Sequence, residues 1–595
     1  MPNNIFSGNE AIALGLIANN CKLVTGYPGT PSSEIIMSLN KMSNIYHSDI
    51  QYDWSINEKV ALEVVMAASW NGIRCAVTMK QVGLNNAADP FYNSAYSEFK
   101  GGCIIIVADD PGCHSSQTEQ DTRLISLVAK IPVLEPSSPQ EAYDMVKIGF
   151  YLSEKYNTLI VLRPTTRICH SYQNVSYDMS FFPIKIEQFY KSNNKLAALA
   201  KERLIIHKEI EKKINSISKE FENNNLNFIK EGQREDIGII ASGVVFNLID
   251  EIVNEYNMGI SILKIGTPYP LPSNLINKYI HSKKMVWCFE ETDACIEMQI
   301  SNRNNISGRL NNCIPNSGEL TYQIVYECLT GKKIGDNLIL QGDRASLCPG
   351  CPHRSSFYTI KHCFGNDAIY ISDIGCYSLG VNMNAIDAFL CMGASISLAE
   401  GFYKSSLINN CKKYIVATIG DSTFFHSGIP ALINAVHTKS KFILIILDNE
   451  TTAMTGGQPT PSNQYLINNQ KANIIDIDDI VKALNIDFFY TVDPYDQEKM
   501  TDVLIKSKEY IKNESKVAII RSKHKCVLST SPQKVALVNI GNECFGCKKC
   551  IIQFDCPAFN FDKGTSKMKI NQDICISCGQ CINKCKYGYI KINQI

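Results

Sequence analysis

The last sixty residues of this 595-residue chain contain eight cysteines in two runs, and no other feature constrains the fold as strongly. The two runs are Cys544, Cys547, Cys550 and Cys556, and then Cys575, Cys578, Cys581 and Cys585. Three cysteines separated by two residues each, followed by a fourth, form the ligand pattern of a 4Fe-4S cluster. Two such runs predict a small two-cluster module that transfers single electrons.

The fourth cysteine of each run usually binds the other cluster in two-cluster ferredoxins. We therefore expect one ligand set of Cys544, Cys547, Cys550 and Cys585, and a second set of Cys556, Cys575, Cys578 and Cys581. The first run is unusual because five residues precede Cys556, and Lys586 follows Cys585 where proline is usual. Zinc fits less well, since structural zinc sites favour paired CxxC halves, and disulfides would require an oxidising compartment.

The rest of the composition is that of an ordinary globular protein. Its 58 basic and 58 acidic residues balance, so charge offers no argument for binding nucleic acid or an anionic membrane. The first fifteen residues lack the pattern of a signal peptide, and no apolar stretch approaches the roughly 18 residues that span a bilayer. We expect a cytoplasmic protein whose 24 cysteines are thiols or metal ligands. Oxygen-labile clusters would suit an anaerobe.

Short β-branched runs alternate with amphipathic stretches along most of the chain, which predicts α/β domains with doubly wound parallel sheets. Functional loops in such sheets lie beyond the carboxyl ends of the strands. Residues from about 180 to 235 differ, because they are rich in Lys, Glu and Asn and read as exposed helices. We expect α/β domains at 1–180, 236–335 and 336–535, a charged helical linker at 181–235, and a ferredoxin-like domain with two 4Fe-4S clusters at 536–595.

Two strand ends in the 336–535 domain carry the pattern of a thiamine diphosphate site. One strand ends in Gly420, Asp421 and Ser422, and the next ends with Asn449 and Thr451. Magnesium neutralises a diphosphate and prefers oxygen ligands, which Asp421, Asn449 and the Thr451 carbonyl can supply. Gly420 would allow close backbone approach, and a helix entered at about 423 would favour the phosphates. Ordinary turns are the alternative, since Asp, Asn and Gly also favour turns.

Several further motifs resemble those of the alpha subunit of the indolepyruvate ferredoxin oxidoreductase family, a branch of the 2-oxoacid:ferredoxin oxidoreductases. The resemblance extends from about residue 8 to the C-terminus, and the segments that carry it are 26–34, 110–117, 163–167, 348–354, 373–377, 420–426 and 448–456. The long gap before Cys556 is also a feature of this family.

The resemblance implies roles for individual residues. Residues 1–180 would bind the aminopyrimidine ring, 336–535 would bind the diphosphate, and 236–335 would be a transketolase-C-like domain. Glu58 matches the glutamate that hydrogen-bonds the aminopyrimidine, with Glu63 or a plain surface glutamate as the alternatives.

The loop at 27–30 resembles a substrate-contacting loop. Thr30 would contact the substrate, and His114 and Ser115 would line the same cavity, although a loop histidine is often incidental.

Related oxidoreductases hold a further 4Fe-4S cluster beside the thiamine. Its ligand spacing matches that of Cys348, Cys351, Cys376 and Cys526, whose alternative role is that of four buried thiols. The indolepyruvate branch is usually described with two clusters only.

The resemblance implies oxidative decarboxylation of an aryl pyruvate such as indolepyruvate to an acyl-coenzyme A, with electrons passed through the clusters to ferredoxin. The cofactors would be thiamine diphosphate, Mg²⁺ and two 4Fe-4S clusters, with a third possible. A separate beta subunit is expected, hence a hetero-oligomer. The alternatives are another 2-oxoacid (pyruvate, 2-oxoglutarate or a branched-chain oxoacid), or an electron-transfer subunit whose thiamine site is vestigial.

Overall fold

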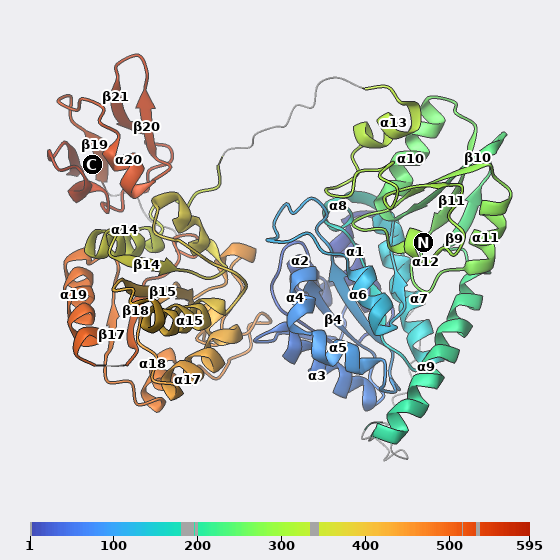
Figure 1. The fold of residues 1–595 in the computed structure, drawn as a ribbon, viewed down its shortest axis with the longest axis horizontal. Helices are drawn as coiled ribbons and strands as arrows, with labels where there is room; N and C mark the ends of the chain where they lie inside the picture. Colours follow the sequence, from blue (N-terminus) through green and yellow to red (C-terminus); the bar gives the residue numbers. More distant parts are fainter. Residues whose placement is uncertain are drawn as a thin grey trace. The chain divides into compact units, whose positions relative to one another are not determined.

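Figure 1 shows the computed structural model of the chain, which describes residues 3–179, 196, 200–333, 344–514, 516–530 and 536–594. The chain divides into two compact units, Met1–Ile339 and Leu340–Ile595, and each is described by itself. The domain boundaries expected near 180, 335 and 535 lie outside the described residues. Within the described residues, no helix is both long enough and apolar enough to cross a membrane.

A six-stranded parallel sheet, with strand order β3-β2-β4-β5-β7-β6, forms the core of the first domain. Its strands are β2 (Leu23–Gly26), β3 (Gln51–Trp54), β4 (Cys75–Lys80), β5 (Cys103–Ala108), β6 (Val133–Leu134) and β7 (Ile160–Leu162). Its helices are α1 (Gly8–Ala18), α2 (Ser33–Ile45), α3 (Glu58–Trp70), α4 (Gln81–Asn86), α5 (Ala88–Ser94), α6 (Thr122–Ala129), α7 (Pro139–Tyr156) and α8 (Thr166–His170). A separate antiparallel pair joins β1 (Asn3–Ser7) to β8 (Tyr172–Ser176).

Helices cover both faces of this sheet. Ile105 packs in one core cluster with Leu62 of α3, whereas Gly149 of α7 lies against Ile104. Because successive side chains of a strand point to opposite faces, α3 and α7 cover opposite sides. Burial on both faces explains why β4 and β5 are apolar along almost their whole length. The expected doubly wound α/β class is confirmed.

A long helix, α9 (Ala200–Phe221), occupies most of the described part of the segment expected to be a linker. Its charged side chains are solvated as expected, but the helix also has a buried apolar face. Ile210 and Ile214 join the core cluster beneath the first sheet, and Ile217 and Phe221 are buried as well. The helix therefore packs as part of this unit.

A second sheet follows, with strand order β13-β12-β10-β11-β9, in which only β9 is antiparallel to its neighbour. Its strands are β9 (Asn227–Lys230), β10 (Arg234–Ser242), β11 (Ile260–Ile265), β12 (Met285–Phe289) and β13 (Ile306–Ser307). Its helices are α10 (Gly243–Glu255), α11 (Ser273–His281), α12 (Cys295–Gln299) and α13 (Tyr322–Thr330). β9 lies inside the range expected to be a linker, so the second sheet begins within that range.

The second unit contains a five-stranded parallel sheet of order β14-β15-β16-β18-β17. Its strands are β14 (Ala368–Ile371), β15 (Tyr414–Gly420), β16 (Ile443–Asp448), β17 (Phe489–Val492) and β18 (Ala518–Lys523). Its helical segments are α14 (Pro352–Phe364), η1 (Cys376–Met383), α15 (Ala394–Asn409), α16 (Asp421–Thr423), η2 (Phe424–Gly428), α17 (Ile429–His437), η3 (Ala453–Thr455), α18 (Ile477–Ala483) and α19 (Gln497–Asn513).

The cysteine-rich module packs against α14 of the same unit (Figure 1). It consists of β19 (Ala536–Ile540), α20 (Lys549–Phe554), β20 (Phe559–Asp562), β21 (Lys567–Ile570), η4 (Ile582–Lys584) and β22 (Ile590–Gln594). Arg354 of α14 donates a 2.9 Å hydrogen bond to the Phe554 carbonyl, and the Lys584 ammonium lies 3.8 Å from the centre of the Tyr358 ring. These contacts fix the module on the domain that contains α14.

Candidate functional site

Two neighbouring strands of the second unit bring the predicted diphosphate residues to one edge of the sheet. β15 pairs with β16 in parallel, and Gly420 lies opposite Leu447. Asp421, directly after β15, and Asn449, directly after β16, therefore meet beyond the carboxyl ends of the strands, where ligands of such sheets bind. A helical run begins at Asp421 and continues through the π-helical η2 to the end of α17. The predicted helix entry is thus present, and its N-terminus favours anions.

Asp421 carries the strongest electrostatic signal at this edge. It is 2% exposed, and its Oδ2 atom has no hydrogen-bond partner within the described chain. Burial, followed by the nearby charge of Asp448, raises the pKa of Asp421 well above its usual value. Asp448 is itself held by Arg521, whose Nε donates to its Oδ2 at 2.7 Å. A buried carboxylate with an unused oxygen beside a second carboxylate fits a divalent cation, which would supply the missing charge and partner.

Asn449 and Thr451, the other predicted magnesium ligands, lie in the loop directly after β16. Asn449 is 6% exposed, and its amide nitrogen lies 3.5 Å from Nε2 of His353. Burial lowers the pKa of His353 to about 4, so this imidazole is neutral near pH 7. The Thr451 carbonyl accepts the N–H of Ala453 at 3.0 Å and keeps a second lone pair. The side-chain oxygen of Ser422 lies 2.5 Å from that of Thr452.

Packing supplies a reason for glycine at position 420 in addition to the expected approach to a phosphate. A Cβ atom there would lie 2.4 Å from a ring carbon of Tyr377. Real Cβ atoms do not approach so closely, so a side chain at 420 would displace this buried ring. Gly420 is therefore required by the packing of Tyr377 beneath the edge, and its close approach to a phosphate stays a prediction.

Glu58 occupies the first turn of α3 in the first unit. The helix starts there because the Asn57 side chain accepts the N–H of Val60 at 2.9 Å, a standard N-cap. Glu58 is 6% exposed, and its Oε2 atom accepts a 3.3 Å hydrogen bond from Asn86. Glu63, the alternative, is half exposed and pairs with Lys59 on the helix surface. Burial thus distinguishes Glu58 from an ordinary surface glutamate.

The predicted substrate loops of the first unit converge on a residue that the sequence reasoning missed. Ser115 donates to the carbonyl of Thr30 at 3.1 Å, which joins the loop after β2 to the loop after β5. Lys80, the last residue of β4 between them, donates to the carbonyl and hydroxyl oxygens of Ser115 at 2.6 and 2.8 Å. A lysine at the end of a buried, mostly apolar strand was a signal for such a site that the sequence itself contained.

His114 lies apart from this group. Its ring is about half exposed, and its Nε2 atom lies 3.3 Å from Glu319. Within the described residues no hydrogen bond joins its side chain to Thr30 or Lys80, so the structure brings Ser115 and Thr30 together but leaves His114 at the periphery.

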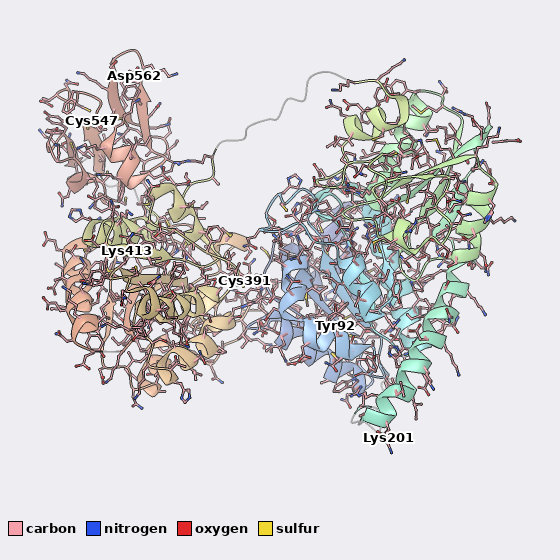
Figure 2. The ribbon with its side chains drawn as sticks, in the orientation of Figure 1. Tyr92, Lys201, Cys391, Lys413, Cys547 and Asp562 are labelled. Atoms are coloured by element: carbon pink, nitrogen blue, oxygen red, sulfur yellow. The ribbon has the colours of Figure 1, made fainter. Side chains whose placement is uncertain are left out.

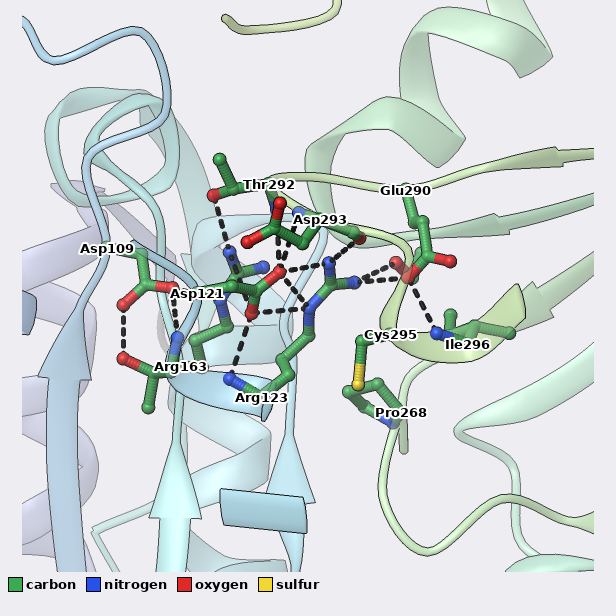
Figure 3. Close-up of polar contacts among 12 residues, drawn as sticks. Asp109, Asp121, Arg123, Arg163, Pro268, Glu290, Thr292, Asp293, Cys295 and Ile296 are labelled. Atoms are coloured by element: carbon green, nitrogen blue, oxygen red, sulfur yellow. Dashed lines mark hydrogen bonds and ion pairs between the residues drawn. The ribbon is translucent and has the colours of Figure 1, made fainter. Parts of the chain in front are cut away.

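The Arg163 motif forms part of a buried charge network between the two sheets of the first unit (Figure 3). Arg163 donates to Asp109 at 2.7 Å and also contacts Glu135, while Arg123 pairs with Asp121 at 2.6 Å and with Glu290 at 3.1 Å. All six side chains are almost fully buried. These loops therefore contain residues that lock two domains together, in addition to any that contact a ligand.

The eight module cysteines line two cavities that separate them into the two sets expected from the crossed ligand pattern. One cavity, of about 330 Å³, is lined by Cys544, Cys547, Cys550 and Cys585. The other, of about 20 Å³, is lined by Cys556, Cys575, Cys578 and Cys581. Cys547 lies at the surface of the module, as Figure 2 shows. Within the described chain, no three His, Cys, Asp or Glu side chains converge as for a single metal ion.

The four cysteines proposed for a third cluster come from three separate segments, with Cys348 and Cys351 in one turn, and lie near one another. Burial, followed by Cys348 and Cys526, raises the pKa of Cys376 to about 11. Burial also raises the pKa of Cys351 to about 12, with smaller contributions from Cys376 and Cys348. The N–H of Cys526 donates to the Asn449 carbonyl at 3.1 Å. The set therefore adjoins the diphosphate edge.

Comparison with known proteins supplies two domain matches. Residues 14–223 match the model described as "Pyruvate flavodoxin/ferredoxin oxidoreductase, thiamine diP-bdg", and residues 373–520 match "Thiamine pyrophosphate enzyme, C-terminal TPP binding domain". The first match contains Thr30, Glu58 and Lys80, and the second contains Asp421 and Asn449.

Curated relatives match nearly the whole chain. A protein of Archaeoglobus fulgidus named "Indolepyruvate oxidoreductase subunit IorA" is 36% identical over 617 residues, which cover 98% of this chain and 96% of the relative. The protein of the same name from Thermococcus kodakarensis is 36% identical over 628 residues, 98% of this chain and 95% of the relative. A "2-oxoglutarate synthase subunit KorA" of Methanocaldococcus jannaschii is 25% identical over 180 residues, 28% of this chain and 47% of the relative.

Proposed function

The chain belongs to the family of indolepyruvate oxidoreductase subunits named IorA, and from this premise we propose that its substrates are aryl pyruvates such as indolepyruvate. It is a thiamine-diphosphate-dependent 2-oxoacid:ferredoxin oxidoreductase of the indolepyruvate type. In the proposed reaction, R–CO–COO⁻ and the thiol of coenzyme A give R–CO–S–CoA, CO₂, one proton and two electrons. The carbon–carbon bond to the carboxylate breaks, and the acyl carbon is oxidised.

Thiamine diphosphate, when bound, supplies an electron sink at the carbon that loses CO₂. Asp421, Asn449 and the Thr451 carbonyl would hold Mg²⁺ and, through it, the diphosphate. The unpartnered Oδ2 atom of Asp421 supports this assignment. Glu58, which is buried at the start of α3, would hydrogen-bond a ring nitrogen of the aminopyrimidine. The domain at 1–180 would thus bind the pyrimidine, and the domain at 336–535 the diphosphate.

One observation carries the proposal that electrons leave this edge through the cysteine-rich module. The start of α14 contacts both sites. His353 lies 3.5 Å from the Asn449 amide, the adjacent Arg354 donates to the module backbone at Phe554, and Cys351 lines the second cysteine cavity. A single short segment therefore connects the diphosphate edge to the predicted clusters. Such an arrangement suits electron transfer over short distances. A thiamine site that worked without the module would not explain why the module is attached here.

The cysteine sets would hold 4Fe-4S clusters that accept the two electrons singly. Cys556, Cys575, Cys578 and Cys581 would bind the cluster nearer to the start of α14, because Cys351 and Arg354 line their cavity, whereas Tyr358 and His362 from further along α14 line the other. Cys544, Cys547, Cys550 and Cys585 would bind the other. The set of Cys348, Cys351, Cys376 and Cys526 would bind a third cluster beside the diphosphate edge.

The relatives are named as subunits, so we expect a separate beta subunit and a hetero-oligomeric enzyme. Ferredoxin would be the electron acceptor, because clusters at the surface of a small module can pass electrons to a protein carrier. The exposed Cys547 belongs to the outer set and is consistent with this exit.

The substrate proposal is tested with the complex of this chain and its beta subunit. Viologen reduction is measured with indolepyruvate, phenylpyruvate, pyruvate, 2-oxoglutarate and a branched-chain oxoacid, each with coenzyme A. We expect the highest kcat/KM with the two aryl pyruvates. A preference for pyruvate or 2-oxoglutarate would overturn the substrate assignment and leave the chemistry intact. Activity that survives in Asp421→Ala would overturn the thiamine assignment, and Asp502→Ala, on the exposed face of α19, is the matched control.

A further inference from the structure

Lys80 is a buried cation at the centre of the loops that the first unit presents beyond its sheet. Its side chain is 9% exposed, and it ends β4, between β2 and β5 in the sheet. The loop after β2 passes directly over it, since a Cβ atom on Gly29 would lie 2.9 Å from the Lys80 Cβ. Ser115 in the loop after β5 accepts two of its ammonium hydrogens. Two loops, from the strands on either side of β4, therefore surround one positive charge.

The charge of Lys80 is only partly compensated. Asp110 lies 4.0 Å away, outside hydrogen-bond distance. The Oδ2 atom of Asp110 already accepts from the N–H of Ser115 at 2.8 Å and the hydroxyl of Ser116 at 2.6 Å, and its Oδ1 atom accepts from Thr166 at 2.7 Å. Within the described chain, the Lys80 ammonium donates hydrogen bonds only to the two Ser115 oxygens, so its third hydrogen has no acceptor within hydrogen-bond distance. Burial lowers the pKa of Lys80 to about 8, although Asp110 opposes this. An added anion would therefore be stabilised here.

We infer that Lys80 binds the carboxylate of the 2-oxoacid substrate, with the Ser115 hydroxyl and the Thr30 loop at its side. This inference rests on the proposed function, because it assigns the anion to the substrate of that reaction. The carboxyl ends of parallel strands are where ligands of such sheets bind. An ammonium with a free hydrogen forms a charge-assisted hydrogen bond to a carboxylate, which is stronger than a neutral one. The phosphates of coenzyme A are a second source of the same negative charge, and the test separates the two.

The test compares Lys80→Met and Lys80→Arg with wild type in the complex with the beta subunit, using whichever 2-oxoacid the wild type oxidises best. Lys80→Met removes a charge-assisted hydrogen bond to the substrate, and this loss of binding free energy should raise KM for the oxoacid about 10- to 100-fold. KM for coenzyme A should stay unchanged. A rise in KM for coenzyme A alone, or unchanged KM values for both, would overturn the inference. The wild type is assayed first. If it oxidises no aryl pyruvate, the proposed function fails, and this result is distinct from any effect of the Lys80 variants.

A binding measurement keeps the inference falsifiable without turnover. A 3-arylpropionate, which lacks the keto group, and its amide serve as competitive inhibitors. Wild type should bind the carboxylate more tightly than the amide, and Lys80→Met should lose most of this difference. An unchanged preference for the carboxylate in Lys80→Met would contradict the role of Lys80.

The pH dependence gives a third readout, which uses a variant that keeps the positive charge. In wild type, affinity for the oxoacid should fall as pH rises through about 8, where Lys80 loses its proton. Lys80→Arg should abolish this fall, because arginine stays charged. The same pH profile in both proteins would refute the assignment.

Lys264 provides a matched control for removing a buried lysine. Its side chain is 1% exposed, it pairs with Glu141, and it lies in β11 of the second sheet rather than in either loop around Lys80. Lys264→Met should lower the thermal midpoint to a similar or larger extent and leave KM for the oxoacid unchanged. If Lys264→Met raised this KM as much as Lys80→Met does, the effect would be one of folding and the inference would fail.

Discussion

Replacing Gly83 by alanine should move the Glu58 carboxylate without unfolding the protein. Gly83 lies in the middle of α4, and a Cβ atom there would lie 2.4 Å from Oε1 of Glu58, whereas ordinary contact starts at 3.4 Å. The carboxylate must therefore shift by about 1 Å, and a misplacement of that size typically costs about 100-fold in rate. Alanine is favoured over glycine in a helix by about 1 kcal/mol, so the backbone itself would tolerate the change.

The assay is oxoacid-dependent viologen reduction, with the thermal midpoint measured in parallel. We expect kcat/KM to fall about 100-fold in Gly83→Ala, towards the level of Glu58→Gln, while the midpoint changes little. Gly401→Ala is the control, because it also lies in a helix but its Cβ atom would meet nothing within 4 Å. Wild-type activity in Gly83→Ala would refute the view that Glu58 must be held in one position for the reaction.

Three other changes test the electrostatics and the cysteines. Asp421→Asn removes one of two neighbouring buried carboxylates, so the thermal midpoint of the cofactor-free protein should rise. The increase in thermal midpoint that Mg²⁺ and thiamine diphosphate give to wild type should disappear in this variant. If the variant kept that increase, the ligand role of Asp421 would be contradicted. Burial raises the pKa of Glu290 to about 7, so the folded state binds its proton more tightly and loses roughly 3 kcal/mol as pH rises from the ordinary carboxyl range through 7. The thermal midpoint of wild type should therefore fall relative to Glu290→Gln over that range, and parallel curves would contradict this. Changing both Cys376 and Cys526 to serine should remove about four of the roughly twelve irons per chain expected for three clusters, whereas changing Cys363 and Cys411 should remove none. Equal iron in both variants would exclude the third cluster.

The α/β architecture and the convergence of strand ends were predictable from the sequence. Apolar runs gave the parallel strands, and the adjacency of β15 and β16 followed because consecutive strands usually pair. The division of the eight cysteines between two cavities follows the spacing rule, although ligation itself stays a prediction. These features depend on local periodicity and on short separations along the chain.

Other features were not predictable, because they depend on side chains that are distant in sequence. Arg123 pairs with Glu290 of another domain, and Tyr377 packs where a Cβ atom on Gly420 would lie. The charged composition of α9 concealed the buried face that Ile210 and Ile214 provide. Lys80 was visible as a lysine at a strand end, but its burial and its bonds to Ser115 required the fold.

The central claim is that oxidation of an aryl pyruvate at the thiamine site sends electrons through the cysteine-rich module. The most direct measurement is the stoichiometry of reduced ferredoxin and acyl-coenzyme A formed from indolepyruvate by the complex with the beta subunit. Two one-electron reductions per acyl-coenzyme A are predicted in wild type. A variant with Cys575, Cys578 and Cys581 changed to serine should retain thiamine diphosphate and lose ferredoxin reduction. Full ferredoxin reduction by that variant, or acyl-coenzyme A formed without it in wild type, would contradict the account.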